Sequence, residues 1–175
     1  MKVQSMIWDP LIRFFHWTVA AMFLLNFLVF EEGDTNHRWA GYYILAALAI
    51  RILWGFVGSK NARFKNFLPT PSGIKHHLHL LKSKQFEVSK GHNPIGGLMV
   101  FALLFCLLSS GISGWMMGLD AFWGEDWLEE IHELIANTTM MLVVFHVSAV
   151  VLFSKFGPVN LIKQMITGQR DKQSK

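Results

Sequence analysis

The chain has 175 residues, of which 52% are hydrophobic and only 16% are charged. Soluble globular domains have roughly 25% charged residues, so this composition excludes an ordinary soluble domain. The formal net charge of +4 comes from basic residues gathered in short segments between apolar runs. We interpret that pattern as a signature of membrane topology, and we expect no nucleic-acid partner.

Four apolar runs are each close to the roughly 20 residues that a membrane-spanning helix requires. They cover residues 11–30, 37–57, 95–117 and 131–153. None of them alternates with a period of two, which favours helices over the strands of a barrel. The sequence therefore predicts an all-α fold, a transmembrane four-helix bundle that forms a single integral-membrane domain over residues 1–175.

The first run begins after Asp9 and Pro10, which suit the N-cap and the first position of a helix. His16 lies roughly 8 Å beyond the start of this run. An ionisable side chain within an apolar span is costly, and by default it indicates a functional site. Arg13 lies about one turn before His16 on a similar face, and we take both as candidate cofactor-binding residues.

The second run carries a histidine at its start and an arginine near its end. His37 opens the run, and Gly41, one turn later, leaves room for the edge of a bulky cofactor, although small residues also serve plain helix packing. Arg51 is equally compatible with two roles. It extends to the lipid headgroups in one and binds an anionic group of a cofactor in the other.

The connection between the second and third runs is basic and contains four histidines. Apolar residues recur at helical spacing within residues 67–83, so we expect an amphipathic helix that lies on the membrane surface. Its histidines, His76, His77 and His79, are expected on a solvated face rather than around a metal ion. His92, just before the third run, suits a haem propionate, a quinone pocket, an inner haem ligand or a helix cap.

The last run contains two histidines, His132 and His146, that are 14 residues apart. At 100° per residue, this spacing returns the second imidazole to within about 40° of the first, roughly 21 Å further along the helix. One face of one helix therefore offers two metal ligands at two depths. Zinc is a poor fit, because its ligands all lie within about 2.1 Å of one centre.

Charge in the connections predicts which ends of the helices share a side of the membrane. Basic residues gather at both termini and in the second connection, which places these segments in the cytoplasm. His37 and His132 are then level near the outer surface, and His16 and His146 are level near the inner surface. Two layers of paired imidazoles suit two low-spin b-type haems with both axial positions filled. Taken singly, His37 and His132 are also compatible with an ordinary role as polar residues at the membrane interface.

The sequence resembles the bacterial cytochrome b561 family, in particular the branch that is similar to the b-type cytochrome subunits of nickel-iron hydrogenases. The matching residues are Trp8-Asp9-Pro10-Leu11-Ile12-Arg13-Phe14-Phe15-His16-Trp17, His37 with Gly41, Arg51 with Trp54-Gly55, Phe67 with Pro69 and Pro71, Gly91-His92-Asn93-Pro94, and His132-Glu133 with His146. This resemblance implies four transmembrane helices in the bacterial inner membrane. It also implies two haem b groups bound at His16, His37, His132 and His146, and electron exchange with the quinone pool.

We therefore expect an electron conduit between the quinone pool and a periplasmic redox protein. The periplasmic connections are predicted to carry eight carboxylates, Glu31, Glu32, Asp34, Asp120, Glu125, Asp126, Glu129 and Glu130, with Glu133 nearby and Arg38 opposing them. Such a field attracts a basic partner such as a small cytochrome c and repels an anion. The alternatives are a superoxide oxidase that passes electrons to ubiquinone, a membrane anchor of a hydrogenase or other oxidoreductase, and a scaffold without redox activity. Quinol or quinone oxidoreductase activity stays open, and no catalytic residue is assigned.

Overall fold

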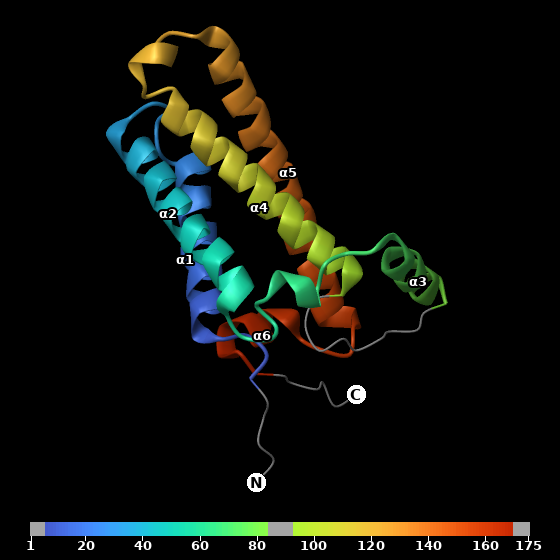
Figure 1. The fold of residues 1–175 in the computed structure, drawn as a ribbon. Coiled ribbons are helices and arrows are strands. Elements are labelled where there is room, and N and C mark those ends of the chain that lie inside the picture. The colour runs from blue at the N-terminus through green and yellow to red at the C-terminus, as the bar shows by residue number, and fades with distance from the viewer. Residues whose placement is uncertain (1–5, 84–92, 170–175) are drawn as a thin grey trace. The chain divides into compact units, whose positions relative to one another are not determined.

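The computed structural model describes residues 6–83 and 93–169, and every regular element in these ranges is a helix (Figure 1). The elements in chain order are α1 (Pro10–Leu28), α2 (Thr35–Val57), η1 (Phe64–Asn66), α3 (Pro71–Lys82), α4 (Pro94–Met116), η2 (Asp120–Phe122), α5 (Asp126–Phe156) and α6 (Leu161–Thr167). Four of them, α1, α2, α4 and α5, are long and apolar enough to cross a membrane. The predicted all-α fold with four candidate membrane spans is confirmed.

The fourth long helix, α5, extends well beyond the apolar run that predicts it. It begins at Asp126 rather than at residue 131 and ends at Phe156, whereas α1, α2 and α4 begin and end within two residues of the expected bounds. Asp126 and Glu129 stand in its first turn, where negative charge is favoured by the helix dipole. Polar residues therefore continue the helix past the apolar stretch that hydropathy detects.

Asp9 joins the start of α1 to the end of α2. Its Oδ1 accepts a hydrogen bond from the Ile12 N–H at 2.9 Å, which confirms the predicted N-cap. Its Oδ2 accepts a hydrogen bond from Trp54 Nε1 at 3.1 Å and another from the Ser59 hydroxyl. One carboxylate thus connects the start of α1 to the end of α2 and the residues just after it, two segments about 45–50 residues apart in the sequence.

The chain divides into two compact units, which we describe separately. Unit 1 comprises Met1–Arg13, Leu53–Phe101 and Val144–Lys175, and unit 2 comprises Phe14–Ile52 and Ala102–Val143. The core of unit 1 contains Ile7, Trp8, Ile12 and Ala62, with Trp54 and Met165 packed against it. The core of unit 2 contains Val19, Phe23, Ile44 and Leu48, with Phe15, Met22, Ala47, Leu104, Leu107, Leu108, Met140 and Val143 packed against it.

In unit 1, the segment around α6 is hydrogen-bonded to the residues that precede α1. The Gly168 carbonyl accepts hydrogen bonds from the backbone N–H groups of Ile7 at 2.8 Å and Trp8 at 3.3 Å. The Arg13 guanidinium donates to the Ile166 carbonyl. Gly168 ends α6 with a φ of 76°, a left-handed conformation that glycine adopts without strain. The two ends of the described chain are therefore held together.

The helix α3 lies where the amphipathic segment was expected, but one of its three histidines is not on the solvated face. His76 and His79 are exposed, whereas only 8% of the His77 surface is accessible. The expectation of a solvated His77 is therefore wrong. One turn earlier, this face of α3 lies near the start of α4, where a Cβ at Gly73 would be 3.6 Å from the Pro94 ring.

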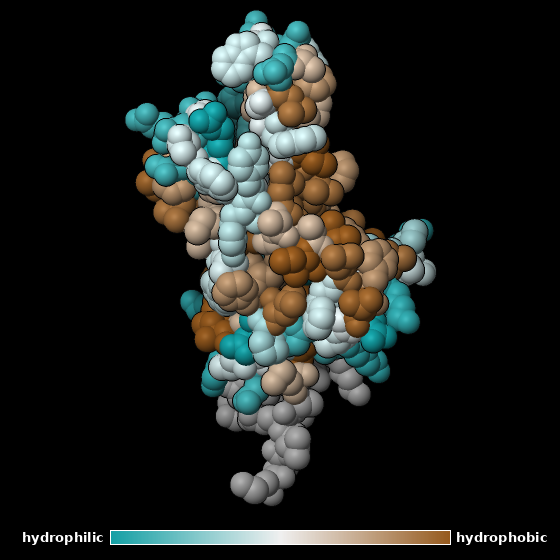
Figure 2. Space-filling view, turned by 60° about the vertical axis from the view of Figure 1, so that its left-hand side comes forward, coloured by the Kyte–Doolittle hydropathy of each residue, from teal (hydrophilic) through white to brown (hydrophobic). Residues whose placement is uncertain are grey.

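In unit 2, the α1–α2 connection and the α4–α5 connection lie at the same end of the helices (Figure 1). Figure 2 shows hydrophilic side chains gathered at that end and apolar side chains along the helices next to it. Nine carboxylates there are exposed: Glu31, Glu32, Asp34, Asp120, Glu125, Asp126, Glu129, Glu130 and Glu133. This end of unit 2 is therefore strongly acidic, with Arg38 as an exposed cation among them.

Candidate functional site

The structure brings together His37 of α2 and His132 of α5 within unit 2. Their ring centroids are 6.2 Å apart, with an angle of 65° between the ring planes. A bond between a metal ion and an imidazole nitrogen is about 2.0–2.1 Å long, so two imidazoles on opposite sides of one ion have ring centres about 6 Å apart. The separation of these two rings therefore fits bis-histidine ligation of a single metal ion.

A serine on α4 fixes the orientation and the tautomer of His132. The Ser113 hydroxyl donates to the Ser110 carbonyl at 3.0 Å, and the same hydroxyl oxygen lies 2.9 Å from His132 Nδ1. Because a hydroxyl has one proton, its oxygen accepts the second hydrogen bond from the Nδ1–H group. The lone pair of the neutral imidazole is then on Nε2, which is the form that binds a metal ion.

Two glycines and one nitrogen without a hydrogen-bond partner lie at this pair of histidines. A Cβ at Gly114 would lie 3.1 Å from His132 Cε1, which is tighter than most real Cβ contacts, so glycine lets α4 approach the ring closely. A Cβ at Gly41, one turn from His37, would meet nothing within 4 Å, so there is open space beside that residue. His37 Nδ1 is buried and has no hydrogen-bond partner. The ligand types, their spacing and the space at Gly41 therefore suit a macrocyclic metal cofactor.

The other two candidate ligands belong to different units. His16 lies on α1 in unit 2, half-buried, with its ring 5.0 Å from that of Trp17 in an edge-to-face arrangement. His146 lies on α5 in unit 1 and is also half-buried. On α5, His132 and His146 are each less exposed than the residues directly before and after them. The pairing of His16 with His146 stays a prediction.

Arg51 is buried near the end of α2, with 4% of its surface accessible. Leu48, one turn earlier, is fully buried in the core of unit 2 together with Val19 of α1. His16 lies one turn before Val19 on α1, and Arg51 lies one turn after Leu48 on α2. Because α1 and α2 are antiparallel, His16 and Arg51 both lie beyond the same end of the core of unit 2. A guanidinium is suited to bind an anionic group of a cofactor by charge-assisted hydrogen bonds, and whether His16 and Arg51 share such a cofactor stays a prediction.

The remaining predicted site residues are Arg13 and His92. The Arg13 guanidinium donates a hydrogen bond to the Ile166 carbonyl in unit 1. Its Nε is buried and has no hydrogen-bond partner. Its role as a cofactor-binding residue stays a prediction. His92 lies outside the described residues.

Sequence reasoning missed Ser113, which contacts a candidate ligand directly. The signal was present, since Ser113 is a buried hydroxyl in an apolar helix and lies between two glycines, Gly111 and Gly114. Glycines indicated close packing of helices, but sequence spacing alone did not show which side chain of α5 would meet the hydroxyl. The contact depends on how α4 packs against α5 in unit 2.

Comparison with known proteins gives one match. The family model of the prokaryotic cytochrome b561 matches residues 7–168, which is nearly the whole chain. No curated protein and no solved structure matches the chain. The matched range includes all four long helices and each of the four candidate ligands.

Proposed function

The chain belongs to the prokaryotic cytochrome b561 family of membrane b-type cytochromes, and on this premise we propose that it carries electrons across the bacterial inner membrane. In this proposal it holds two haem b groups and connects the quinone pool to a periplasmic redox protein such as a small cytochrome c. Bound haem supplies the one-electron iron(III)/iron(II) couple on which such transfer depends.

The observation that supports the proposal most directly is the pair of His37 and His132. Their ring separation of 6.2 Å suits two axial ligands of one iron, and Ser113 holds His132 in the metal-binding tautomer. We assign the outer haem to this pair. Two histidines from the protein would hold this haem, and ligation of that kind would suit electron transfer.

We assign the inner haem to His16 and His146. Arg51 would hold a propionate of that haem, because a buried guanidinium binds a carboxylate by charge-assisted hydrogen bonds. A buried cation near the iron also favours the reduced state, since reduction lowers the positive charge in a region of low dielectric constant. The residues of the chain therefore position the two haems and tune their potentials, and they form no covalent intermediate.

The acidic end of unit 2 supports a basic partner on the periplasmic side. Nine carboxylates are exposed there, and they are located on the two connections and the adjoining helix turns. In the proposed orientation these connections face the periplasm, because the basic residues gather in the other segments. A surface of this charge attracts a basic cytochrome c and disfavours superoxide, which is an anion.

The test is a haem-to-polypeptide count with reduced-minus-oxidised spectra of the purified protein. We expect two haems per chain, one after His37→Ala and one after His146→Ala, with the spectrum of a different haem lost in each case. The matched control is His76→Ala, an exposed histidine on α3, which should retain both haems.

Two results would contradict the proposal. A colourless wild-type protein, or one with a single haem, would refute the two-haem conduit. Rapid quinone-dependent oxidation of superoxide by the purified protein would show that superoxide, and not a periplasmic redox protein, is the electron donor.

A further inference from the structure

The short helix α6 in unit 1 exposes an apolar face that also carries a lysine. Ile162 and Ile166 are 37% and 53% exposed, and Lys163, which shares their face of the helix, is exposed as well. The other face is directed inward, since only 6% of the Gln164 surface is accessible and Met165 packs against the core of unit 1. Exposed isoleucines beside a lysine suit a helix that lies at the boundary between lipid headgroups and acyl chains.

A fixed corner joins α6 to the end of α5. The buried Ser154 hydroxyl oxygen accepts hydrogen bonds from the backbone N–H groups of Leu161 at 3.0 Å and Ile162 at 3.4 Å. Asn160 Oδ1 accepts another from the Lys163 N–H at 2.9 Å. In Figure 1, α6 runs across the direction of α5 and does not continue it. Because α5 is long and apolar enough to cross a membrane, a helix that runs crosswise at its end lies along the membrane surface.

Two exposed lysines flank this corner. Lys155 follows Ser154 directly, and Lys163 follows Ile162 directly. The Nζ atom of Lys155 lies 5.5 Å from the centroid of the Phe156 ring, which is 59% exposed. The end of α5 therefore combines a cation with exposed apolar surface, as α6 does. Because the N–H groups that begin α6 are bonded within the protein, an anion at this corner would be bound by the lysine side chains.

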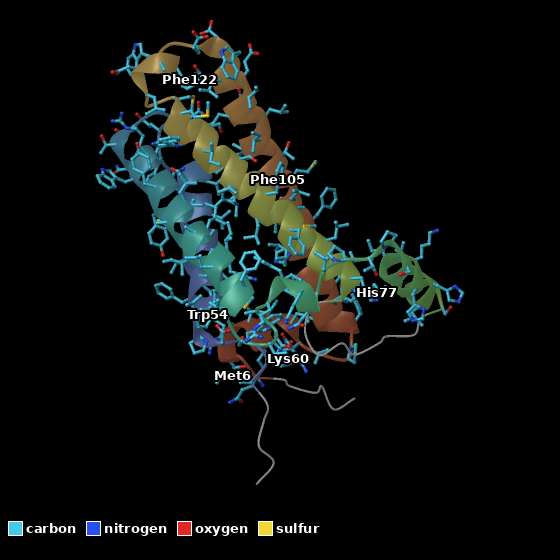
Figure 3. All side chains as sticks on the ribbon, viewed as in Figure 1. Met6, Trp54, Lys60, His77, Phe105 and Phe122 are labelled. Atoms are coloured by element: carbon cyan, nitrogen blue, oxygen red, sulfur yellow. The ribbon has the colours of Figure 1, made fainter. Side chains whose placement is uncertain are left out.

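The described part of unit 1 is strongly basic. Among these residues Asp9 is the only one with a carboxylate side chain, whereas the exposed lysines include Lys60, Lys65, Lys75, Lys155 and Lys163. Lys60 lies at the end of unit 1 where α6 is found (Figure 3), because its neighbour Asn61 donates to the Ile7 carbonyl at 3.0 Å and the Ile7 N–H donates to Gly168. Charge complementarity therefore favours an anionic occupant.

We propose that the α5–α6 corner, formed by Lys155, Phe156, Ile162, Lys163 and Ile166, binds an anionic phospholipid. The two ammonium groups bind the headgroup phosphate, and the three apolar side chains contact the first carbons of the acyl chains. A lipid fits this corner better than a free phosphate ion, which would leave the apolar side chains in water. In the orientation argued above, the lipid belongs to the cytoplasmic leaflet. Lipid binding at this corner does not depend on bound haem.

The experiment measures lipid binding to the purified protein by native mass spectrometry. Phosphatidylglycerol is compared with phosphatidylcholine of the same acyl chains, which has the same phosphate but no net charge. The test variant is Lys155→Gln/Lys163→Gln, and the control Lys65→Gln/Lys75→Gln removes equal charge elsewhere in unit 1. We expect the test variant to bind phosphatidylglycerol about 25-fold more weakly, at about fivefold for each lysine, and phosphatidylcholine as wild type does. The control should bind both lipids as wild type does.

Two further variants separate the parts of the corner. Lys155→Arg/Lys163→Arg should retain the preference for phosphatidylglycerol, because arginine also binds phosphate, so loss of the preference there would overturn the proposal. Ile162→Ser/Ile166→Ser should weaken the binding of both lipids, and unchanged binding would mean that the corner recognises phosphate alone and not a lipid.

The comparison of the two lipids gives the remaining outcomes. Equal affinities of the wild type for phosphatidylglycerol and phosphatidylcholine would overturn the proposal. An equal loss of phosphatidylglycerol binding in the test variant and the control would do the same, because binding would then follow the overall charge of unit 1 and not this corner. Neither result would change the haem count, so the proposed function stands or fails separately.

Discussion

Ser113 is the residue whose replacement most directly tests the proposed outer haem site at His37 and His132. In Ser113→Ala the hydrogen bond to His132 Nδ1 is lost, and loss of such a supporting partner typically lowers metal affinity by about 10- to 100-fold. The imidazole also becomes a weaker base, so the potential of the outer haem should rise. Haem retention during dilution and a redox titration measure the two effects. Ser110→Ala is the control, because Ser110 contributes its backbone carbonyl, which the substitution keeps. Equal haem retention and potential in the two variants would contradict the role of Ser113.

Asp9 makes the stability of unit 1 depend on pH. Burial alone would raise the pKa of this carboxyl group, but hydrogen bonds from Ser59, Ile12, Trp54 and Leu11 together outweigh it and lower the pKa below the usual 3.8. The folded state thus binds this proton more weakly than the unfolded state does. The stabilisation is complete above the unfolded pKa and is lost as the pH falls through the folded value.

We therefore expect acid unfolding of the wild type to begin near pH 4 and below, in part through Asp9. Asp9→Ala should lower the free energy of unfolding by about 0.5–2 kcal/mol at neutral pH, as for other lost helix caps. Denaturant unfolding in detergent at pH 7 and pH 3.5 measures both effects. If the difference between wild type and variant is the same at the two pH values, the carboxylate is not the responsible group.

At the scale of the elements, the end of α2 is held against η1 by a glycine and an aromatic ring. A Cβ at Gly55 would overlap the Phe64 ring, which is itself packed among Phe56, Phe67 and Phe101 and has little freedom to move. Gly55→Ala should therefore destabilise the protein by about 1–3 kcal/mol through overpacking. Thermal unfolding in detergent measures the loss.

The double variant Gly55→Ala/Phe64→Leu is the control for this prediction. The smaller leucine side chain leaves room for the new methyl group, so the second substitution should cost less in the Gly55→Ala background than in wild type. Additive losses would mean that the Phe64 ring is not what restricts residue 55.

Hydropathy predicted the bounds of a helix well wherever the apolar run covers the whole helix. It located α1, α2 and α4 within two residues, because these helices are apolar along their length. It missed the first turn of α5, which is acidic, and it did not predict α6, which has only seven residues. Side-chain contacts such as Ser113 with His132, and the burial of His77, depend on packing between helices that spacing along one helix does not contain.

At the scale of the whole molecule, the separation of charge predicts how electron exchange with a partner responds to salt. The rate of electron exchange with a basic cytochrome c should fall steeply as ionic strength rises, because salt screens the exposed carboxylates of unit 2. The variant Glu129→Lys/Glu130→Lys should slow the reaction at low salt and flatten its salt dependence. Stopped-flow absorbance measures both. Haem reduction by a neutral quinol, as the control, should not change, and a salt-independent rate with cytochrome c would contradict the proposed docking.

The hydrogen bonds from Ile7 and Trp8 to Gly168 set an order for biogenesis. During translation the amino-terminal span enters the bilayer first, long before residue 168 has left the ribosome. The backbone N–H groups of Ile7 and Trp8 therefore lack the Gly168 carbonyl as their acceptor until every span has been inserted. Closure of this end therefore follows the insertion of all four spans.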